Sequence, residues 1–113
     1  MDMLPRDRIS ASISTTKDAG RVALVPFVTA GYPDKNTFIE TLRSLALEGD
    51  VIEVGVPFSD PMADGVTIQR SSHAAIAAGV SLHWIIDQLT AAEDIGVPIV
   101  LMSYLNPLLA FGF

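Results

Sequence analysis

Three carboxylic side chains, Glu53, Asp60 and Asp64, stand within one short run, Val51-Ile-Glu-Val-Gly-Val-Pro-Phe-Ser-Asp-Pro-Met-Ala-Asp-Gly65. Carboxyl groups transfer protons in active sites, cap helices and turns, or bind metal ions. Glu53 is the least expected of the three, because it stands inside an apolar stretch, whereas Asp60 and Asp64 follow in a segment with turn-forming residues. Glu53 is therefore the strongest candidate for a chemical role.

The stretch Val51 to Val56 is predicted to form a strand of a sheet that is buried on both faces. Alternate side chains of a strand share a face, so Glu53 lies with Val51 and Gly55, while the bulky residues point the other way. An ionised group buried there costs several kcal/mol unless it is paired. Glu53 is therefore either a structural ion-pair or edge-strand residue, or a carboxyl group aimed into a ligand pocket and suited to proton transfer.

The segment after this strand favours the second interpretation. In parallel α/β folds, ligands bind beyond the carboxyl ends of the strands, and Pro57 to Gly65 begins there. Asp60 can also cap a turn, and Asp64 can be a turn residue or the cap of a helix that starts near Thr67. Three acids also allow a metal site, but no histidine lies near them in the sequence, and we expect none.

A later run, Met102-Ser-Tyr-Leu-Asn-Pro107, ends a third predicted strand at the same edge. Tyr104 can form the wall of an aromatic pocket. Asn106 can bind a ligand or simply start a turn before the proline, and the turn is the simpler local explanation. His73 and His83 are predicted to lie on helix surfaces away from this edge, and Trp84 to pack between its helix and the sheet.

These groups require a scaffold of buried strands joined by helices. Such an alternation implies right-handed parallel βαβ units, which close into a (β/α)₈ barrel or form an open doubly wound sheet. Pro26 cannot donate a ladder hydrogen bond, so the first strand must bend, bulge or lose a pairing. The predicted order is a helix ending at Gly20, strand 22–28, a helix capped by Asp34 or Asn36 and ending at Gly49, strand 51–56, helices 67–78 and 81–95, and strand 97–104.

Composition excludes several classes of protein. The 113 residues are half hydrophobic, which suits one domain or part of a larger one. A net charge of −6 disfavours nucleic acid and anionic lipid as partners, and the absence of cysteine excludes disulfides and thiol chemistry. The apolar runs are far shorter than the roughly 20 residues that span a bilayer, and the start does not resemble a signal peptide. We expect a soluble, cytoplasmic protein.

Four stretches together resemble successive motifs of the tryptophan synthase alpha subunit. The resemblance covers essentially the whole chain, and the central motif is long and specific. The stretches are Pro26-Phe-Val-Thr-Ala-Gly-Tyr-Pro-Asp34, Glu53-Val-Gly-Val-Pro-Phe-Ser-Asp-Pro-Met-Ala-Asp-Gly65, Ile68-Gln69 and Pro98-Ile-Val-Leu-Met-Ser-Tyr-Leu-Asn-Pro107.

The resemblance implies that residues 1–113 are the N-terminal part of a single (β/α)₈ TIM-barrel domain, with its first three βα units. It implies a lyase of tryptophan biosynthesis that cleaves indole-3-glycerol phosphate to indole and glyceraldehyde 3-phosphate. It also implies an alpha2-beta2 complex, in which the beta subunit carries pyridoxal phosphate and receives the indole through a tunnel. No cofactor is expected in this chain itself.

The resemblance also assigns roles to individual residues. The family's general acid–base glutamate falls on Glu53, and the aspartate that holds the indole N–H falls on Asp64. Phe27 and Tyr104 match positions that line the substrate pocket. Positions near the contact with the beta subunit match Pro57, Asp60, Pro61 and Asn106.

Three features depart from the family pattern. Val66 stands where the family usually has proline, which predicts a less rigid loop, and the turn Glu48-Gly-Asp50 is one residue shorter than expected, which leaves the register of the preceding helix open. The loops and short helix that hold the substrate's phosphate are expected beyond Phe113. Three strands alone also leave a sheet edge and an apolar face uncovered.

Two other hypotheses remain open from the sequence. The chain by itself can be catalytically silent and act as a partner-binding or self-associating piece. It can also belong to another phosphosugar-binding barrel enzyme with a glutamate on its second strand.

Overall fold

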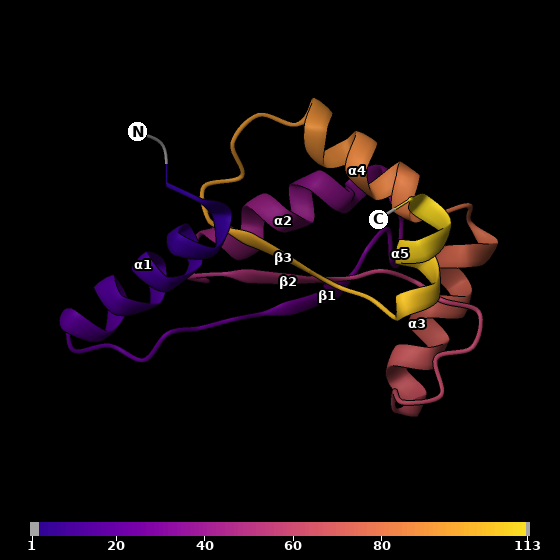
Figure 1. The fold of residues 1–113 in the computed structure, drawn as a ribbon, viewed down its shortest axis with the longest axis horizontal. Coiled ribbons are helices and arrows are strands. Elements are labelled where there is room, and N and C mark those ends of the chain that lie inside the picture. Colours follow the sequence, from indigo (N-terminus) through magenta and orange to yellow (C-terminus); the bar gives the residue numbers. More distant parts are fainter. Residues whose placement is uncertain (1–2, 113) are drawn as a thin grey trace.

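A computed structural model describes residues 3–112 as a three-stranded parallel sheet with helices around it (Figure 1). The sheet order is β1-β2-β3, so the second strand is central. The parallel pairing predicted from the alternating helices and buried strands is confirmed. The elements are α1 (Pro5–Asp18), β1 (Phe27–Thr29), the 3₁₀ helix η1 (Lys35–Thr37), α2 (Phe38–Ala46), β2 (Ile52–Gly55), α3 (Val66–Ala77), α4 (Leu82–Ala91), β3 (Ile99–Met102) and α5 (Leu105–Phe111).

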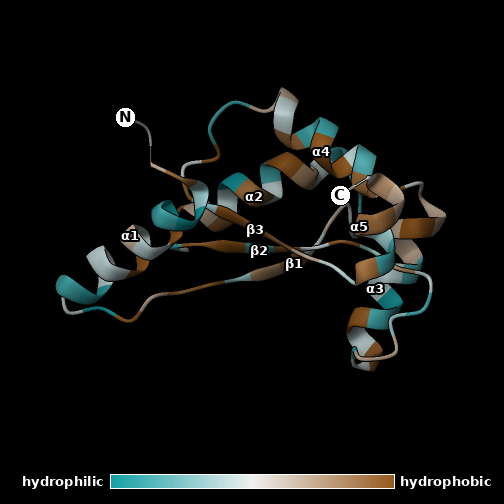
Figure 2. Cartoon of the chain, in the orientation of Figure 1, coloured by the Kyte–Doolittle hydropathy of each residue, from teal (hydrophilic) through white to brown (hydrophobic). Residues whose placement is uncertain are grey.

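The core lies between one face of the sheet and the helices α2 and α4, which cover that face in Figure 1. Ile52 and Val54 of β2 are completely buried there, together with Leu42 of α2 and Ile85 of α4. Burying each such side chain stabilises the fold by about 1.5–3 kcal/mol. Figure 2 shows the strands as mainly apolar and α1 as mainly polar, so α1 contributes little to this core.

The opposite face of the sheet is open in the part of the chain that the structure describes. Phe27 of β1 and Met102 of β3 belong to it and are 39% and 47% exposed. The register aligns Phe27 with Glu53 and aligns Gly55 with Met102. The sheet therefore has one packed face and one face on which Glu53 stands.

The strands are shorter than predicted. The first was expected over residues 22–28 but covers only Phe27–Thr29, and Val22 is 92% exposed rather than buried. Before β1, the carbonyl of Pro26 accepts from Glu53 N–H (2.9 Å) and the carbonyl of Leu24 accepts from Asp50 N–H (2.8 Å), while Leu24 N–H bonds to the Asp50 side chain instead of to a strand. A regular ladder is not formed there, because proline has no N–H to donate.

The helix boundaries were predicted more closely than the strand boundaries. Asp34, rather than Asn36, is the cap, and its carboxylate accepts from Asn36 N–H in η1 (2.9 Å). Ser81 caps α4 as predicted, accepting from Trp84 N–H (3.1 Å). However, α4 ends at Ala91 rather than near residue 95, because Asp94 closes a turn of its own with Gly96 N–H (2.9 Å).

Trp84 is a packing residue, as predicted, and lies partly buried against the core between the helices and the sheet. Its ring packs on Phe38 at the start of α2, with ring centroids 5.3 Å apart. The ammonium group of Lys35 lies 5.4 Å from the centre of the indole ring, within cation–π range. Trp84 therefore joins α4 to α2.

None of the described helices combines the length and apolar character that crossing a lipid bilayer requires.

Asp50 connects α1 to the sheet at the short turn before β2. Its carboxylate accepts from the Thr16 hydroxyl (2.6 Å) and from Leu24 N–H (2.8 Å), and its carbonyl accepts from the Ser12 hydroxyl (2.6 Å). The bonds from Thr16 and Leu24, helped by the charge of Arg21, lower the pKa of Asp50 below its usual value of 3.8. The ionised carboxylate is therefore the form that holds α1 in place.

We expect Asp50→Asn to lower the melting temperature near neutral pH, because asparagine has one acceptor oxygen in place of two and lacks the charge that strengthens the bonds from Thr16 and Leu24. A carboxyl whose pKa falls on folding stabilises the fold above its unfolded pKa, near pH 4, and this contribution is lost as the pH falls through the folded pKa. Thermal unfolding between about pH 7 and pH 2 should thus show a smaller acid-induced loss in the variant. Asp87→Asn, at an exposed position of α4, is the control. An unchanged acid response in Asp50→Asn would contradict this role.

Candidate active site

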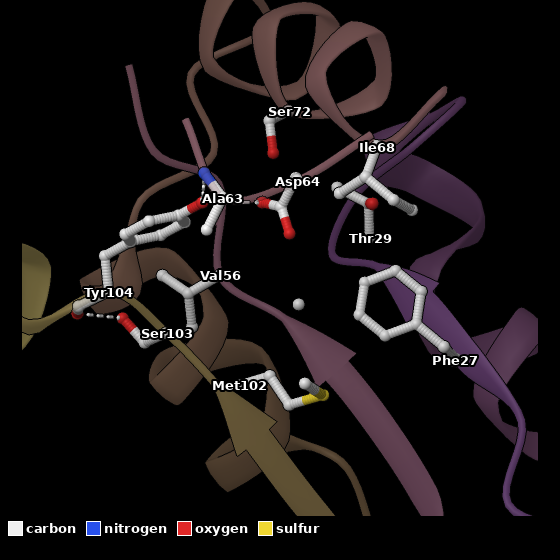
Figure 3. Close-up of a pocket in the computed structure, with 11 residues that line it drawn as sticks. Phe27, Thr29, Val56, Ala63, Asp64, Ile68, Ser72, Met102, Ser103 and Tyr104 are labelled. Atoms are coloured by element: carbon white, nitrogen blue, oxygen red, sulfur yellow. Dashed lines mark hydrogen bonds between the residues drawn. The ribbon is translucent and has the colours of Figure 1, made fainter. Parts of the chain in front are cut away.

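A cavity of about 200 Å³ opens at the carboxyl ends of the three strands, where the sequence predicted the ligand edge (Figure 3). Its walls are mostly apolar and aromatic, with a small group of polar atoms along one side. Such a combination suits a small ligand that has an apolar body and few polar groups. The lining residues are Phe27, Thr29, Gly55, Val56, Ala63, Asp64, Ile68, Ser72, Met102, Ser103 and Tyr104.

Asp64 is half-buried and places its carboxylate at this cavity. The prediction that it can cap α3 is not fulfilled, since Gly65 holds the cap position and no side chain caps that helix. Instead, the Tyr104 hydroxyl donates to the Asp64 carboxylate (3.2 Å), as Figure 3 shows. The carboxylate thus keeps free acceptor positions toward the cavity, since an ionised carboxyl group accepts up to about four hydrogen bonds.

Tyr104 also fixes the loop that carries Asp64. Its hydroxyl oxygen accepts from Ala63 N–H (2.9 Å), and its ring lies 5.2 Å from that of Phe58, measured between centroids. Gln69 of α3 donates to the carbonyl of Asp64 (2.9 Å). The loop after β2 is therefore tied both to the end of β3 and to the first turns of α3.

Glu53 stands on the central strand, half-buried, on the open face of the sheet. The edge-strand explanation therefore fails for this sheet, and no cation within residues 3–112 forms an ion pair with Glu53. Glu53 is not itself among the residues that line the cavity. It precedes Gly55, which does line it, by two residues on the same face, a separation of about 7 Å along a strand.

The ring of Phe27 lies across β2 because residue 55 has no side chain. A Cβ atom at Gly55 would stand 2.6 Å from Cζ of Phe27, which is too close for two carbon atoms that are not bonded to each other. Glycine is therefore required here for the ring to reach the cavity wall. The sequence placed Gly55 on the small-residue face but did not identify this contact.

The four residues assigned to a partner contact lie at the same end of the sheet and differ in exposure. Pro57 and Pro61 are buried within the loop, while Asp60 and Asn106 are exposed. Asn106 does not start an isolated turn, because it lies in the first turn of α5, which begins at Leu105. Exposed Asp60 and Asn106 are free to meet another molecule, whereas the prolines shape the loop.

His73 was expected to lie away from this edge, and that is wrong. The residue is exposed on α3, as predicted, but its Nε2 atom lies 3.3 Å from the carbonyl oxygen of Ser59 in the loop after β2. His83 is exposed, and its ring contacts that of Phe111 in a tilted arrangement, with ring centroids 4.5 Å apart. Within residues 3–112, the three acids of the central motif do not converge into a metal-binding group.

Several residues of the cavity were not identified from the sequence. Thr29 ends β1, Ile68 and Ser72 come from α3, and Met102 ends β3. Thr29 and Met102 could have been identified, because residues at the carboxyl ends of parallel strands commonly line the ligand site. No local pattern indicates Ser72, because the direction in which a helix presents a small residue depends on how the helix is packed.

We expect Tyr104→Phe to loosen the loop, because Ala63 N–H loses its acceptor and Asp64 loses a donor. Loss of one such bond corresponds to roughly 1 kcal/mol, so amide hydrogen exchange of Ala63 should accelerate about fivefold to tenfold. The matched control is Tyr32→Phe, because the Tyr32 side chain is exposed and its hydroxyl forms no hydrogen bond within residues 3–112. Unchanged exchange at Ala63 would show that the other loop contacts suffice.

Comparison with known proteins agrees with this geometry. The family model described as "Tryptophan synthase alpha chain" matches residues 13–113. The alpha chain of Nitratidesulfovibrio vulgaris is 47% identical over 94% of this chain, and that of Burkholderia mallei is 49% identical over 93%. These alignments cover 42% and 40% of the two relatives, so the chain spans about two fifths of their length.

Solved structures of the same family also match this chain. Tryptophan synthase from M. tuberculosis, in its aminoacrylate-bound form, superposes with a TM-score of 0.84 at 35% identity, covering 93% of this chain and 43% of the other. The alpha subunit from Legionella pneumophila gives 0.82 at 33%, covering 93% and 41%. The predicted fold class, the first three βα units of a (β/α)₈ barrel, is confirmed. By sequence and by structure, the chain belongs to the tryptophan synthase alpha chain family.

Proposed function

We propose that this chain forms the N-terminal part of a single (β/α)₈ barrel domain that cleaves indole-3-glycerol phosphate to indole and glyceraldehyde 3-phosphate. Membership of the family supports this function. The observation that carries it is the Asp64 carboxylate, which Tyr104 holds at the side of an otherwise mostly apolar cavity. An indole ring needs this arrangement, because it is a flat apolar body with a single N–H donor.

The chemistry divides between the two acids. Cleavage breaks the bond between ring carbon C3 and the glycerol chain, so C3 must gain a proton while the glycerol hydroxyl loses one and becomes a carbonyl. Glu53 moves these protons as general acid and base. Asp64 accepts the ring N–H and stabilises the positive charge that develops on the ring nitrogen when C3 is protonated.

Two aromatic residues complete the proposed contact with the substrate. Phe27 and Tyr104 both line the cavity and would bracket the indole ring. The phosphate would be held by backbone N–H groups in segments outside this chain, because the relatives are more than twice as long. Binding of the ring and binding of the phosphate would thus be supplied by different parts of one barrel.

The decisive test uses a complete barrel, made by joining this chain to the remaining segment of the Burkholderia mallei alpha chain. Indole release from indole-3-glycerol phosphate is expected, and Glu53→Gln should reduce it by about 100- to 10,000-fold, the range for loss of a general acid–base group. Glu48→Gln removes an exposed carboxylate before β2 and should leave the rate unchanged. Full activity in Glu53→Gln would show that another group transfers the protons.

We also infer a partner and a location. The expected partner is a tryptophan synthase beta subunit that carries pyridoxal phosphate, in an alpha2-beta2 complex in the cytoplasm. The loop after β2 and the start of α5 support this inference, because Asp60 and Asn106 are exposed and lie within four residues of Asp64 and Tyr104, which line the cavity. Pro57 and Pro61 would hold the loop in the shape that the partner meets.

Replacing both exposed residues, Asp60→Ala with Asn106→Ala, should weaken binding of the joined barrel to a beta subunit by about 5- to 30-fold. The reason is that polar contacts at the edge of an interface typically contribute up to about 1 kcal/mol each. Sedimentation of mixtures over a concentration series measures this, and Asp87→Asn on α4 is the control. Equal affinity of the double variant would place the partner on another surface.

A further inference from the structure

Gly55, the last residue of β2, lines the cavity without a side chain. Its φ is not among the positive values that favour glycine, so the backbone at this position would accept another residue. The three atoms that an added Cβ would approach most closely all belong to the ring of Phe27. They are Cζ at 2.6 Å, Cε2 at 2.9 Å and Cε1 at 3.7 Å. The contact with Phe27 is therefore the steric reason for glycine here.

A side chain at residue 55 would move the Phe27 ring into the cavity. Residue 55 faces the open side of the sheet, and the ring lies over it on that side. Carbon atoms that are not bonded to each other pack about 3.5–4.0 Å apart, so the ring would have to retreat by about 1 Å. Phe27 is 39% exposed and can make this movement, because the contacting atoms stand at the far end of its side chain.

The opposite wall of the cavity is fixed. Figure 3 shows the rings of Phe27 and Tyr104 on opposite sides of the cavity. The Tyr104 hydroxyl is bonded to both Asp64 and Ala63, and its ring packs on that of Phe58. The distance between the two aromatic walls therefore depends on how closely the Phe27 ring lies on β2.

We propose that Gly55 is a specificity-determining residue of this site. By letting the Phe27 ring lie directly on β2, it sets the largest ring system that fits between the two aromatic walls. This inference rests on the proposed indole site and deepens it, because it predicts that the site discriminates among substituted indoles by size. One additional carbon atom in an apolar pocket changes affinity by about 10- to 200-fold.

The first test is a double-mutant cycle for indole binding to the joined barrel, measured by titration calorimetry. Gly55→Ala should weaken indole binding by about tenfold or more, because the walls move closer together. Leucine ends at Cδ and lacks the ring atoms that the added Cβ would meet. In a Phe27→Leu barrel, Gly55→Ala should therefore change the affinity by less than about twofold.

The second test compares indole with the isomers that carry one methyl group on its carbocyclic ring. Relative to indole, at least one isomer should gain about tenfold in affinity in Phe27→Leu, because the smaller side chain opens the wall. The same isomer should lose affinity relative to indole in Gly55→Ala. Gly65→Ala is the matched control for this ratio, because its φ is −72° and an added Cβ would meet no atom within 4 Å.

Distortion of β2 by the added methyl group would weaken indole binding in the Phe27→Leu barrel as well, and that result would overturn the inference. Equal ratios of methylindole to indole affinity in the parent and in Phe27→Leu would also overturn it, and this comparison decides even where Gly55→Ala alone does not fold. Turnover of indole-3-glycerol phosphate by the parent barrel tests the proposed function separately. A barrel with the expected size limit but no turnover would reject the reaction and leave the role of Gly55 standing.

Discussion

The burial of one face of the central strand β2 is the constraint on which the rest of the structure depends. Ile52 and Val54 must leave water, and they do so against α2 and α4. Because side chains alternate along a strand, this burial commits Glu53 and Gly55 to the other face. The same packing that stabilises the fold therefore places a carboxylate and a gap for the Phe27 ring on the side where a ligand can approach.

Tyr104 fixes the loop that carries Asp64 to the end of β3. Its hydroxyl joins two segments 40 residues apart in sequence, by donating to Asp64 and accepting from Ala63. A carboxylate on a loop would otherwise sample many directions, and fixing it before a ligand binds reduces the entropy lost on binding. The loop between β2 and α3 contains no helix or strand, but these bonds and the buried prolines hold it against the end of the sheet.

The helices before β3 were predicted because their signals are local, whereas α5 was not predicted. Ser81 and Gly79 mark boundaries through hydrogen bonds and backbone angles formed within a few residues. Strand ends depend on a neighbouring strand, and so residues 22–26 were predicted as strand although their partners form no ladder with them. The contact of Trp84 with Phe38 was not predicted for a related reason, since it joins two helices distant in sequence.

The sequence by itself determined the parallel α/β fold, the face of β2 on which Glu53 stands, and the end of the sheet where Asp64 lies. These follow from periodicity and from the direction of the chain, which are fixed locally. Only the tertiary structure decided that Tyr104 holds Asp64, that Gly55 makes room for Phe27, and that the buried Ser72 lines the cavity. Such contacts depend on how separate elements pack in space, and no spacing along the chain specifies that packing.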